Sequence, residues 1–557
     1  MGVPRFFQFV KQTFPDTVHK TNIKEPFITN VDNFYIDANG ILHNCVREVF
    51  FSSHNKDTHH KRLAFNKTKP PTSTKPTLKK VYTTISDYIT QIVEYVHPSS
   101  VLFIAIDGPA PLAKQSQQRQ RRFRSAQETD ENIFKLFDKN AITPGTSFMA
   151  DLSSYLETFI INKMNTNNYW KSLNIVFSNS NVPGEGEHKI IQYIRNLSNK
   201  NLVTHCMYGL DADLFMLSLS THCPKFYLLR EDIFHVCDYT TYFHVANIGL
   251  LQQQLFERWD SKTDHTTQTR LVNDFIFISF LVGNDFLHAT PMCHNLVWAI
   301  PFMMDIRQQA LNNDYITTPN GHGFYLKKLL LFCSKLQHYE SNAIADLARN
   351  NTFQYPAVNS SLIDTHNITK GIHIDIFKKH YYKKAHCHNQ TDIMNLTKEY
   401  IQGLEWVNAY YHSTSKNWLW MYPSHYTPLI SDIVTFLKSG TKITKLSNKQ
   451  YDPIDPFEQL LCVLPPKSKH LIPKTLHVIL EQLSDYYPEE FQVDIEGKTR
   501  EWQGIALLPF LPYERLHELY IQKKKLKTIK HNKLNTLAST LSYSYIDNTV
   551  SSANISL

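Results

Sequence analysis

Residues 33–37, NFYID, form a short run of apolar and aromatic residues that ends in a carboxylate. Three later runs have the same character: VLFIAID (101–107), LNIVFSN (173–179) and VTHCMYGLD (203–211). Their length and composition are typical of buried strands. Stretches with helical periodicity, such as TISDYITQIVEYV (84–96) and HKIIQYIRNL (188–197), stand between them. This alternation predicts an α/β fold with a mostly parallel sheet flanked by helices.

Acidic residues stand where the predicted strands end, or in turns that contain some of the chain's few glycines. In open α/β sheets, ligands bind outside the carboxyl ends of the strands, so these acids should meet at one rim. Two pairs have i, i+2 spacing, which points both side chains of an extended pair the same way. The candidate residues are Asp37, Asp107, Glu185, Glu187, Asp211, Asp213 and Asp285.

So many carboxylates at one rim would repel one another unless cations neutralise them. Oxygen ligands without paired Cys or His favour Mg²⁺ or Mn²⁺. The number of acids suffices for two ions, the arrangement that stabilises the attacking and leaving oxygens of a phosphodiester. The alternative is a set of unrelated surface carboxylates, some of them helix caps. We favour a nuclease-type metal centre.

A basic stretch, GPAPLAKQSQQRQRRFRSAQE (108–128), follows Asp107 directly. After its two prolines the residues are good helix formers. One face of that helix would carry Lys114, Gln118, Arg121 and Arg122. Cations beside a metal centre can bind a terminal phosphate through charge-assisted hydrogen bonds. A solvated basic helix is the alternative.

The composition is that of a globular protein with more than one folded unit: 557 residues, 42% hydrophobic and 19% charged. The net charge of +8 is compatible with a polyanionic partner. No apolar run is long enough for a membrane span, and MGVPRFFQFVKQTF (1–14) lacks the features of a signal peptide. The eight cysteines contain no C-x-x-C pair, which speaks against a zinc module or a disulfide framework. We therefore expect an intracellular protein with no membrane partner.

Several blocks resemble the Xrn family of 5′→3′ exoribonucleases, in the family's order. The first set is MGVPRFF (1–7), FYIDANGILHNC (34–45), IAIDGPAPLAKQSQQRQRRFR (104–124), VPGEGEHKI (182–190), GLDADLFML (209–217) and FLVGNDFLHATP (280–291). The second set is YIQGLEWVNAYYHSTSKNWLWMYPSHYTPLISDI (400–433), DPFEQLLCVLP (455–465) and EWQGIALLPFLPYERL (501–516). The departures are Ala38, Gly40 and His288. We expect a short form that lacks the long C-terminal extension of large members.

The resemblance implies roles for the residues that match these blocks. The seven acids would form the Mg²⁺-dependent centre, with two ions expected and Mn²⁺ able to substitute. Lys114, Gln118, Arg121 and Arg122 would bind the 5′-monophosphate. His43 would stack on a base opposite a tryptophan of NWLWMYP, and both Trp418 and Trp420 qualify. Aromatic stacking suits a single strand, because every base offers a π-face.

The resemblance also implies a fold and an activity. We expect a core like that of PIN and flap nucleases, with a second, more helical region packed against it. The activity would be processive 5′→3′ hydrolysis of 5′-monophosphorylated single-stranded RNA to mononucleotides. The alternatives are a flap-type structure-specific DNA nuclease and an inactive RNA-binding scaffold. We expect a monomer in the cytoplasm, with the nucleus as the alternative, and leave a decapping partner open.

We divide the chain into four parts. Residues 1–345 form a nuclease domain, 346–390 a linker, 391–520 the second conserved region that helps to close the active site, and 521–557 a basic and then polar tail. Residues 52–80 are polar, basic and interrupted by prolines, which predicts an excursion loop. We expect the C-terminal tail to fray.

Overall fold

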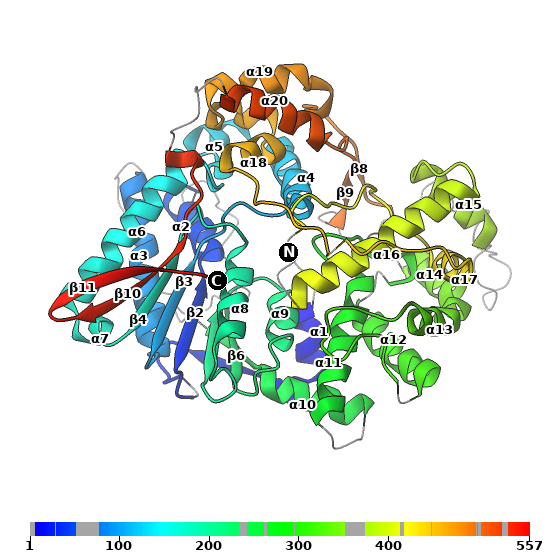
Figure 1. The fold of residues 1–557 in the computed structure, drawn as a ribbon, viewed down its shortest axis with the longest axis horizontal. Helices are drawn as coiled ribbons and strands as arrows, with labels where there is room; N and C mark the ends of the chain where they lie inside the picture. Colours follow the sequence, from blue (N-terminus) through cyan, green and yellow to red (C-terminus); the bar gives the residue numbers. More distant parts are fainter. Residues whose placement is uncertain are drawn as a thin grey trace.

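Figure 1 shows the fold in a computed structural model. A large sheet with helices on both faces lies on one side of the molecule, and two groups of helices lie beside and above it. The structure describes residues 6–27, 29–51, 77–232, 242–260, 265–293, 296–312, 314–350, 374–412, 417–446, 448–496, 498, 503–525 and 533–557.

The sheet has nine strands in the order β1-β7-β6-β5-β2-β3-β4-β10-β11. Its five central strands, β6 to β4, are parallel, and the outer strands are antiparallel. The predicted α/β class is confirmed. The strands are β1 (Val18–Asn22), β2 (Asn33–Asp37), β3 (Val101–Ala105), β4 (Asn174–Ser178), β5 (His205–Tyr208), β6 (Phe226–Glu231), β7 (Tyr242–Asn247), β10 (Thr540–Ile546) and β11 (Thr549–Ile555).

Both faces of the central strands are buried, which is why NFYID has no polar alternation. Phe34 and Ile36 of β2 face one hydrophobic core, and Tyr35 faces the other. Helices α2 (Asn39–Phe51), α3 (Leu78–Val96) and α6 (Ser147–Thr166) bury their apolar residues in the first core. The second core receives α1 (Phe6–Thr13), α8 (Gly186–Asn196), α9 (Leu214–Leu219), α10 (Ile248–Trp259) and α11 (His265–Ser279).

The second core continues without interruption into the helices of the later sequence, so the sheet and these helices share one packed interior. The boundary at residue 345 and the other domain limits remain predictions. The helices concerned are α12 (Leu296–Leu311), α13 (Leu326–Leu336), α14 (Glu340–Asn350), α15 (Ile374–Lys384), α16 (Gln390–His412) and α17 (Ile430–Lys438).

A third core lies above the sheet in Figure 1 and joins α4 (Leu112–Glu128) to the last helices of the chain. Leu112 and Phe123 of α4 belong to it. The basic helix therefore packs against helices of the later sequence through this third core. The same core contains residues of α18 (Pro456–Val463), α19 (His477–Gln482), α20 (Tyr513–Lys525) and β9 (Ile505–Ala506), and β9 pairs with β8 (Val493–Asp494). Helix α7 (Asn168–Lys171) buries Trp170 in the first core, whereas α5 (Glu131–Leu136) buries no residue.

The expectation that the C-terminal residues fray is wrong for residues 540–555. They form the hairpin β10–β11, which extends the sheet beyond β4. Asp547 and Asn548 both have positive φ, at 50° and 62°, which is the signature of a two-residue type I′ turn. The alternating sequence TLSYSYI supplies a strand with one buried aromatic side chain, Tyr543.

Two predicted loops lie mostly outside the described residues. Of the excursion at 52–80, the described part begins at Thr77, which caps α3 by accepting a hydrogen bond from the Lys80 amide at 3.3 Å. Residues 78–80 are therefore helical rather than loop. Of the linker at 346–390, residues 346–350 belong to α14, residues 374–384 form α15, and Gln390 begins α16. No helix in the described parts of the chain has both the length and the apolar character that a membrane span requires.

Tyr543→Ala should destabilise the protein. The side chain is 1% exposed, and its hydroxyl donates to Glu157 Oε1 at 2.9 Å. Losing a buried aromatic ring typically costs about 3 kcal/mol or more. Thermal unfolding should show a clear drop in melting temperature, whereas Ile546→Ala, at a side chain that is 54% exposed in the same strand, should leave it nearly unchanged. Equal melting temperatures would mean that the hairpin does not pack on the sheet.

Candidate functional site

The carboxyl ends of adjacent parallel strands bring the predicted acids together. Asp37 is the last residue of β2 and lies level with Ala105 of β3, two residues before Asp107. Strand β5 pairs with β2 on the other side, although about 170 residues separate them, and Asp211 follows β5 closely. The strand order, rather than the sequence order, therefore places these acids at one rim.

Carboxylate oxygens from these strands come within 4.8 Å of one another in overlapping groups. Glu187, on the first turn of α8, belongs to every such group among the described residues. The groups are Asp37 with Asp107 and Glu187, Glu187 with Asp211 and Asp213, and Glu185 with Glu187 and His188. Six of the seven predicted acids are thus assembled, and His188 joins as a ligand candidate that we did not predict.

The turn before α8 holds the centre in place through its backbone. The Gly186 amide donates to Asp107 Oδ1 at 2.7 Å. A Cβ atom at residue 186 would lie 2.7 Å from Asp37 Oδ1, so only glycine lets the helix approach this closely. Lys189 is buried and donates to the carbonyl oxygens of Ile106 at 2.6 Å and Val182 at 3.2 Å, which ties α8 to the end of β3.

Asp285 joins the centre through Lys114. The Lys114 ammonium donates to Asp285 Oδ2 at 2.7 Å and forms an ion pair with Glu185, and all three side chains are buried. Burial disfavours the Asp285 carboxylate, but Lys114 holds its pKa below the ordinary value. The first cationic residue of α4 therefore pairs with two of the acids. Its phosphate-binding role, which the resemblance implies, remains a prediction.

Burial and neighbouring carboxylates disfavour the ionised form of Asp37, Glu187 and Asp213. Burial, with contributions from Asp107 and Asp211, raises the pKa of Asp37 well above its ordinary value. Burial, Glu185 and Asp37 do the same for Glu187. Burial, Asp211 and Asp285 raise the pKa of Asp213 to about 7.

These groups fit divalent cations. Oxygen donors dominate, the carboxylates are crowded, and Asp213 Oδ1 is buried without a hydrogen-bond partner in the described part of the chain. A cation would relieve both the repulsion and the unmet acceptor, and Mg²⁺-type ions prefer this donor set.

The other three residues of the predicted phosphate site lie farther along α4. Arg121 is exposed, and Gln118 is 4% exposed, with no described hydrogen-bond partner for its Oε1. The Arg122 guanidinium contacts Thr143 Oγ1 and the Ile142 carbonyl. Burial and the neighbouring Arg121 lower the pKa of Arg122 to about 9. This face therefore carries positive charge that no described carboxylate pairs with.

His43 borders this basic face. Its side chain is open to solvent, yet enough protein surrounds it that desolvation, followed by Arg121, Arg122 and Arg47, lowers its pKa to about 3. The imidazole is thus neutral and lies among cations. Arg47, one helical turn after His43, is a cation of this site that we did not predict.

The structure separates the two candidate stacking tryptophans. Trp420 is 8% exposed, packs at 4.8 Å on Trp406, and touches Gly403 of α16. Trp418 is half-buried, and its carbonyl accepts a hydrogen bond from the Leu112 amide at 2.8 Å, at the start of α4. Trp418 is thus the tryptophan beside the basic helix, whereas Trp420 is a core residue.

Tyr410 of α16 reaches the acidic centre from the second conserved region, and we did not predict it. Its buried hydroxyl donates to Glu185 Oε1 at 2.7 Å. Its ring stacks on that of Trp406, with 4.8 Å between the ring centroids, and its centroid lies 4.0 Å from that of the His188 ring. The sequence signal for Tyr410 was its i, i+4 spacing from Trp406. This spacing places both residues on one helix face but does not show which part of the protein packs against that face.

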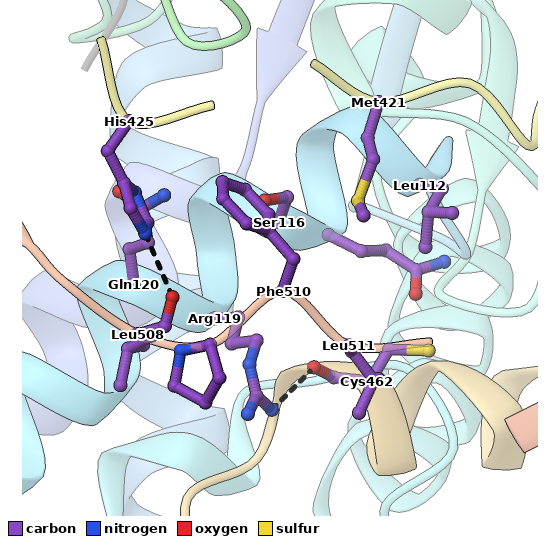
Figure 2. A pocket seen from close by; sticks show the side chains of 12 residues that line it. Leu112, Ser116, Arg119, Gln120, Met421, His425, Cys462, Leu508, Phe510 and Leu511 are labelled. Carbon is purple, nitrogen blue, oxygen red and sulfur yellow. Dashed lines mark hydrogen bonds between the residues drawn. The ribbon is translucent and has the colours of Figure 1, made fainter. Parts of the chain in front are cut away.

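The opposite face of α4 is fixed by the second conserved region. Figure 2 shows the buried Arg119 donating to the Cys462 carbonyl, at 3.2 Å, and the His425 ring bonded to the Leu508 carbonyl, at 2.9 Å. The Ala110 amide also donates to Gln459 Oε1, at 2.8 Å. These contacts set the position of α4, and with it the position of Lys114 and Arg121 relative to the acids.

Two family profiles match the sequence: the XRN 5′-3′ exonuclease N-terminus over residues 1–232, and the Xrn1 helical domain over residues 265–370 and 371–546. The chain belongs to the Xrn family. The blocks that carry the acids fall in the first match except for Asp285, and Tyr410 and Trp418 fall in the second. The family's two conserved regions therefore meet at this site.

Curated members of the Xrn family align with nearly the whole chain. The 5′-3′ exoribonuclease 1 of Homo sapiens is 31% identical over 604 residues, covering 93% of this chain and 34% of the human protein. The Saccharomyces cerevisiae 5′-3′ exoribonuclease 1 is 29% identical and covers 93% of this chain and 43% of its own length. The Arabidopsis thaliana 5′-3′ exoribonuclease 2 is 28% identical, and the alignment covers 96% of this chain and 68% of the Arabidopsis protein. The chain thus spans less than half the length of the first two.

Without metal, stability should fall as pH rises from about 4 to about 7. Because the folded state binds the Asp213 proton more tightly than the unfolded chain, this contribution is complete below the ordinary aspartate pKa and lost as pH passes about 7. In EDTA at pH 7, Asp213→Asn should therefore stabilise the protein by about 2 to 4 kcal/mol. Melting curves across this pH range check both statements.

The control for this experiment is Asp485→Asn, at an exposed carboxylate remote from the centre, which should leave the pH profile unchanged. Mg²⁺ should raise the melting temperature of the wild type at pH 7 and do so less for Asp213→Asn. A destabilised Asp213→Asn protein in EDTA would contradict a repelling cluster.

Proposed function

We propose that the chain is a metal-dependent 5′→3′ exoribonuclease that releases mononucleotides processively from 5′-monophosphorylated single-stranded RNA. One observation carries the proposal: α4 begins among the carboxylates at Lys114 and continues into a basic face at Arg121. At about 1.5 Å per residue, these two positions lie about 10 Å apart along the helix, which is on the scale of one nucleotide. A phosphate on the basic face would place the next phosphodiester near the acids.

The carboxylates would hold Mg²⁺, with Mn²⁺ as a substitute, and two ions fit their number. When bound, these ions supply an activated water and offset charge on the phosphate. Glu187 is a member of all three ligand groups, so it would fix the spacing between them. Lys114 neutralises Glu185 and Asp285 and lies one helical turn before Gln118 of the basic face.

The 5′ end would be recognised by charge and by stacking. Gln118, Arg121 and Arg122 would bind the terminal phosphate, and His43 with Trp418 would enclose the first bases. A neutral His43 stacks without competing for the phosphate. We further propose that the protein acts as a cytoplasmic monomer; a decapping partner would supply its 5′-monophosphate substrates.

Tyr410→Phe should slow RNA hydrolysis about tenfold to a hundredfold. The lost hydrogen bond to an ionised carboxylate is worth about 1.5 to 3 kcal/mol, and Glu185 would be free to rotate. The Mg²⁺ concentration for half-maximal rate should rise as well. Release of mononucleotides from 5′-monophosphate RNA measures both quantities.

Tyr411→Phe is the matched control. Its hydroxyl is also buried, one residue along the same helix, but has no hydrogen-bond partner among the described residues. This variant should keep the wild-type rate and metal dependence. If both variants lose the same activity, the effect of Tyr410 is one of packing and the positioning role is wrong.

The function itself is tested with one RNA bearing a 5′-monophosphate, a 5′-hydroxyl, a 5′-triphosphate or a cap, with Mg²⁺ or with EDTA. The wild type should degrade the monophosphate RNA fastest, to mononucleotides, and only with metal. Arg121→Ala should remove most of the preference over 5′-hydroxyl RNA, by about tenfold or more. Arg124→Ala should not, since Arg124 pairs with Glu128 on the same helix.

Two alternatives predict different products. A flap-type nuclease would prefer branched DNA and release oligonucleotides, and an inactive scaffold would bind RNA without metal-dependent cleavage. Equal rates on 5′-monophosphate and 5′-hydroxyl RNA would overturn the phosphate site and the 5′→3′ direction.

A further inference from the structure

A stretch rich in lysine begins at the end of α17 and belongs to neither the acidic centre nor the basic face of α4. Residues 433–451 contain no aspartate or glutamate, but they contain four lysines: Lys438, Lys442, Lys445 and Lys449. All four side chains are exposed. None of them forms an ion pair with a carboxylate of the described residues. Folding therefore leaves these charges available to a partner, which should be anionic.

The backbone of this lysine stretch is fixed along α16, which distinguishes it from a free surface loop. The Gln402 side chain donates to the Thr444 carbonyl at 3.0 Å, and the Leu446 amide donates to Glu405 Oε2 at 2.8 Å. Ile443 and Leu446 pack against the second core. The backbone and the apolar side chains thus face the protein, while the lysines remain in solvent at fixed positions along α16.

The lysine stretch runs along α16 toward the acidic centre. Thr444 is bonded to Gln402 and Leu446 to Glu405, so the stretch and the helix advance in the same direction. Tyr410, five residues beyond Glu405, donates to one of the acids of the centre. At about 1.5 Å per residue, Glu405 and Tyr410 lie about 8 Å apart along the helix. The lysines therefore lead toward the proposed place of cleavage.

The same stretch is joined to the tryptophan that we propose as a base-stacking residue. Asn417 Nδ2 donates to the Leu446 carbonyl at 2.9 Å, and the Trp406 indole donates to the Asn417 carbonyl at 3.0 Å. Trp418 follows directly, and its carbonyl accepts a hydrogen bond from the Leu112 amide at the start of α4. The lysine stretch, the stacking position and the basic helix thus share one hydrogen-bonded support.

We infer that the lysine stretch is a second RNA-binding surface, which holds phosphates of the single strand downstream of the bases enclosed at Trp418. The inference rests on the proposed function, because it leads the strand from the acidic centre along α16. Ammonium groups bind phosphates as point charges and read no bases, which suits an enzyme that advances along any sequence. Tyr451, which is 41% exposed, adds a ring on which a base can stack. Cations combined with an exposed aromatic ring favour a single-stranded nucleic acid over other anions.

The test measures the salt dependence of RNA binding in EDTA for the wild type and for Lys442→Gln/Lys445→Gln. For a single strand, each phosphate that a cation neutralises contributes about 0.7 to the slope of log affinity against log salt concentration, so the double variant should reduce the steepness for a long unstructured 5′-monophosphate RNA by about 1.4. A 5′-monophosphate trinucleotide reaches only the position between His43 and Trp418, so its slope should not change. Both side chains are exposed, and the melting temperature should stay that of the wild type.

The matched control is Lys200→Gln/Lys225→Gln. It removes the same charge beside His205 at the amino end of β5, on the edge of the sheet opposite the acids. Its slope should equal that of the wild type. The charge-preserving variant Lys442→Arg/Lys445→Arg should also keep the wild-type slope. Equal slopes for the wild type and Lys442→Gln/Lys445→Gln on the long RNA, or an equal loss in the control, would overturn the inference.

The inference and the proposed function can fail separately. A wild type that did not hydrolyse 5′-monophosphate RNA with Mg²⁺ would contradict the proposed function, whereas a reduced slope in EDTA would still support an RNA-binding surface at the lysines. A membrane surface is the other extended anion that exposed lysines can bind. If Lys442→Gln/Lys445→Gln lost binding to phosphatidylserine vesicles but kept the wild-type slope on RNA, the partner would be a membrane and the inference would be wrong.

Discussion

The Lys114 ammonium contacts Glu185 and Asp285 where the carboxyl ends of four parallel strands crowd acids together. Crowded, buried carboxylates are costly unless cations compensate them. One lysine cannot neutralise all of them. The raised pKa values of Asp37, Glu187 and Asp213 reflect the burial and repulsion that Lys114 leaves uncompensated. Much of the surrounding structure, from the Gly186 amide to the Tyr410 hydroxyl, serves to hold these oxygens in place.

The second conserved region matters because it holds α4 in position and also contacts one of the acids. Arg119 and Ala110 bond to residues of α18, and Leu112 bonds to the Trp418 carbonyl. The same region contributes Tyr410 to Glu185. A shift of this region would therefore move the basic face and the acidic centre relative to each other.

Much of the site could be read from local patterns. Asp37, Asp107 and Asp211 follow runs that are too apolar to be anything but buried strands, and parallel strands align their carboxyl ends. The spacing of Lys114, Gln118 and Arg121 defines one face of a helix. Tyr410 and Trp418 could not be assigned in this way, because a tyrosine in an apolar helix or a tryptophan in an aromatic segment reads as core until its neighbours are known.

By itself, the sequence determined the α/β class, the identity of the clustered acids and the basic face of α4, since strand and helix periodicity are local properties. Only the tertiary structure decided that β5 lies beside β2, that Trp420 is buried while Trp418 is not, and that residues 540–555 complete the sheet. It also placed Lys114 among the acids. Those outcomes depend on contacts between residues far apart in the chain, which local spacing does not encode.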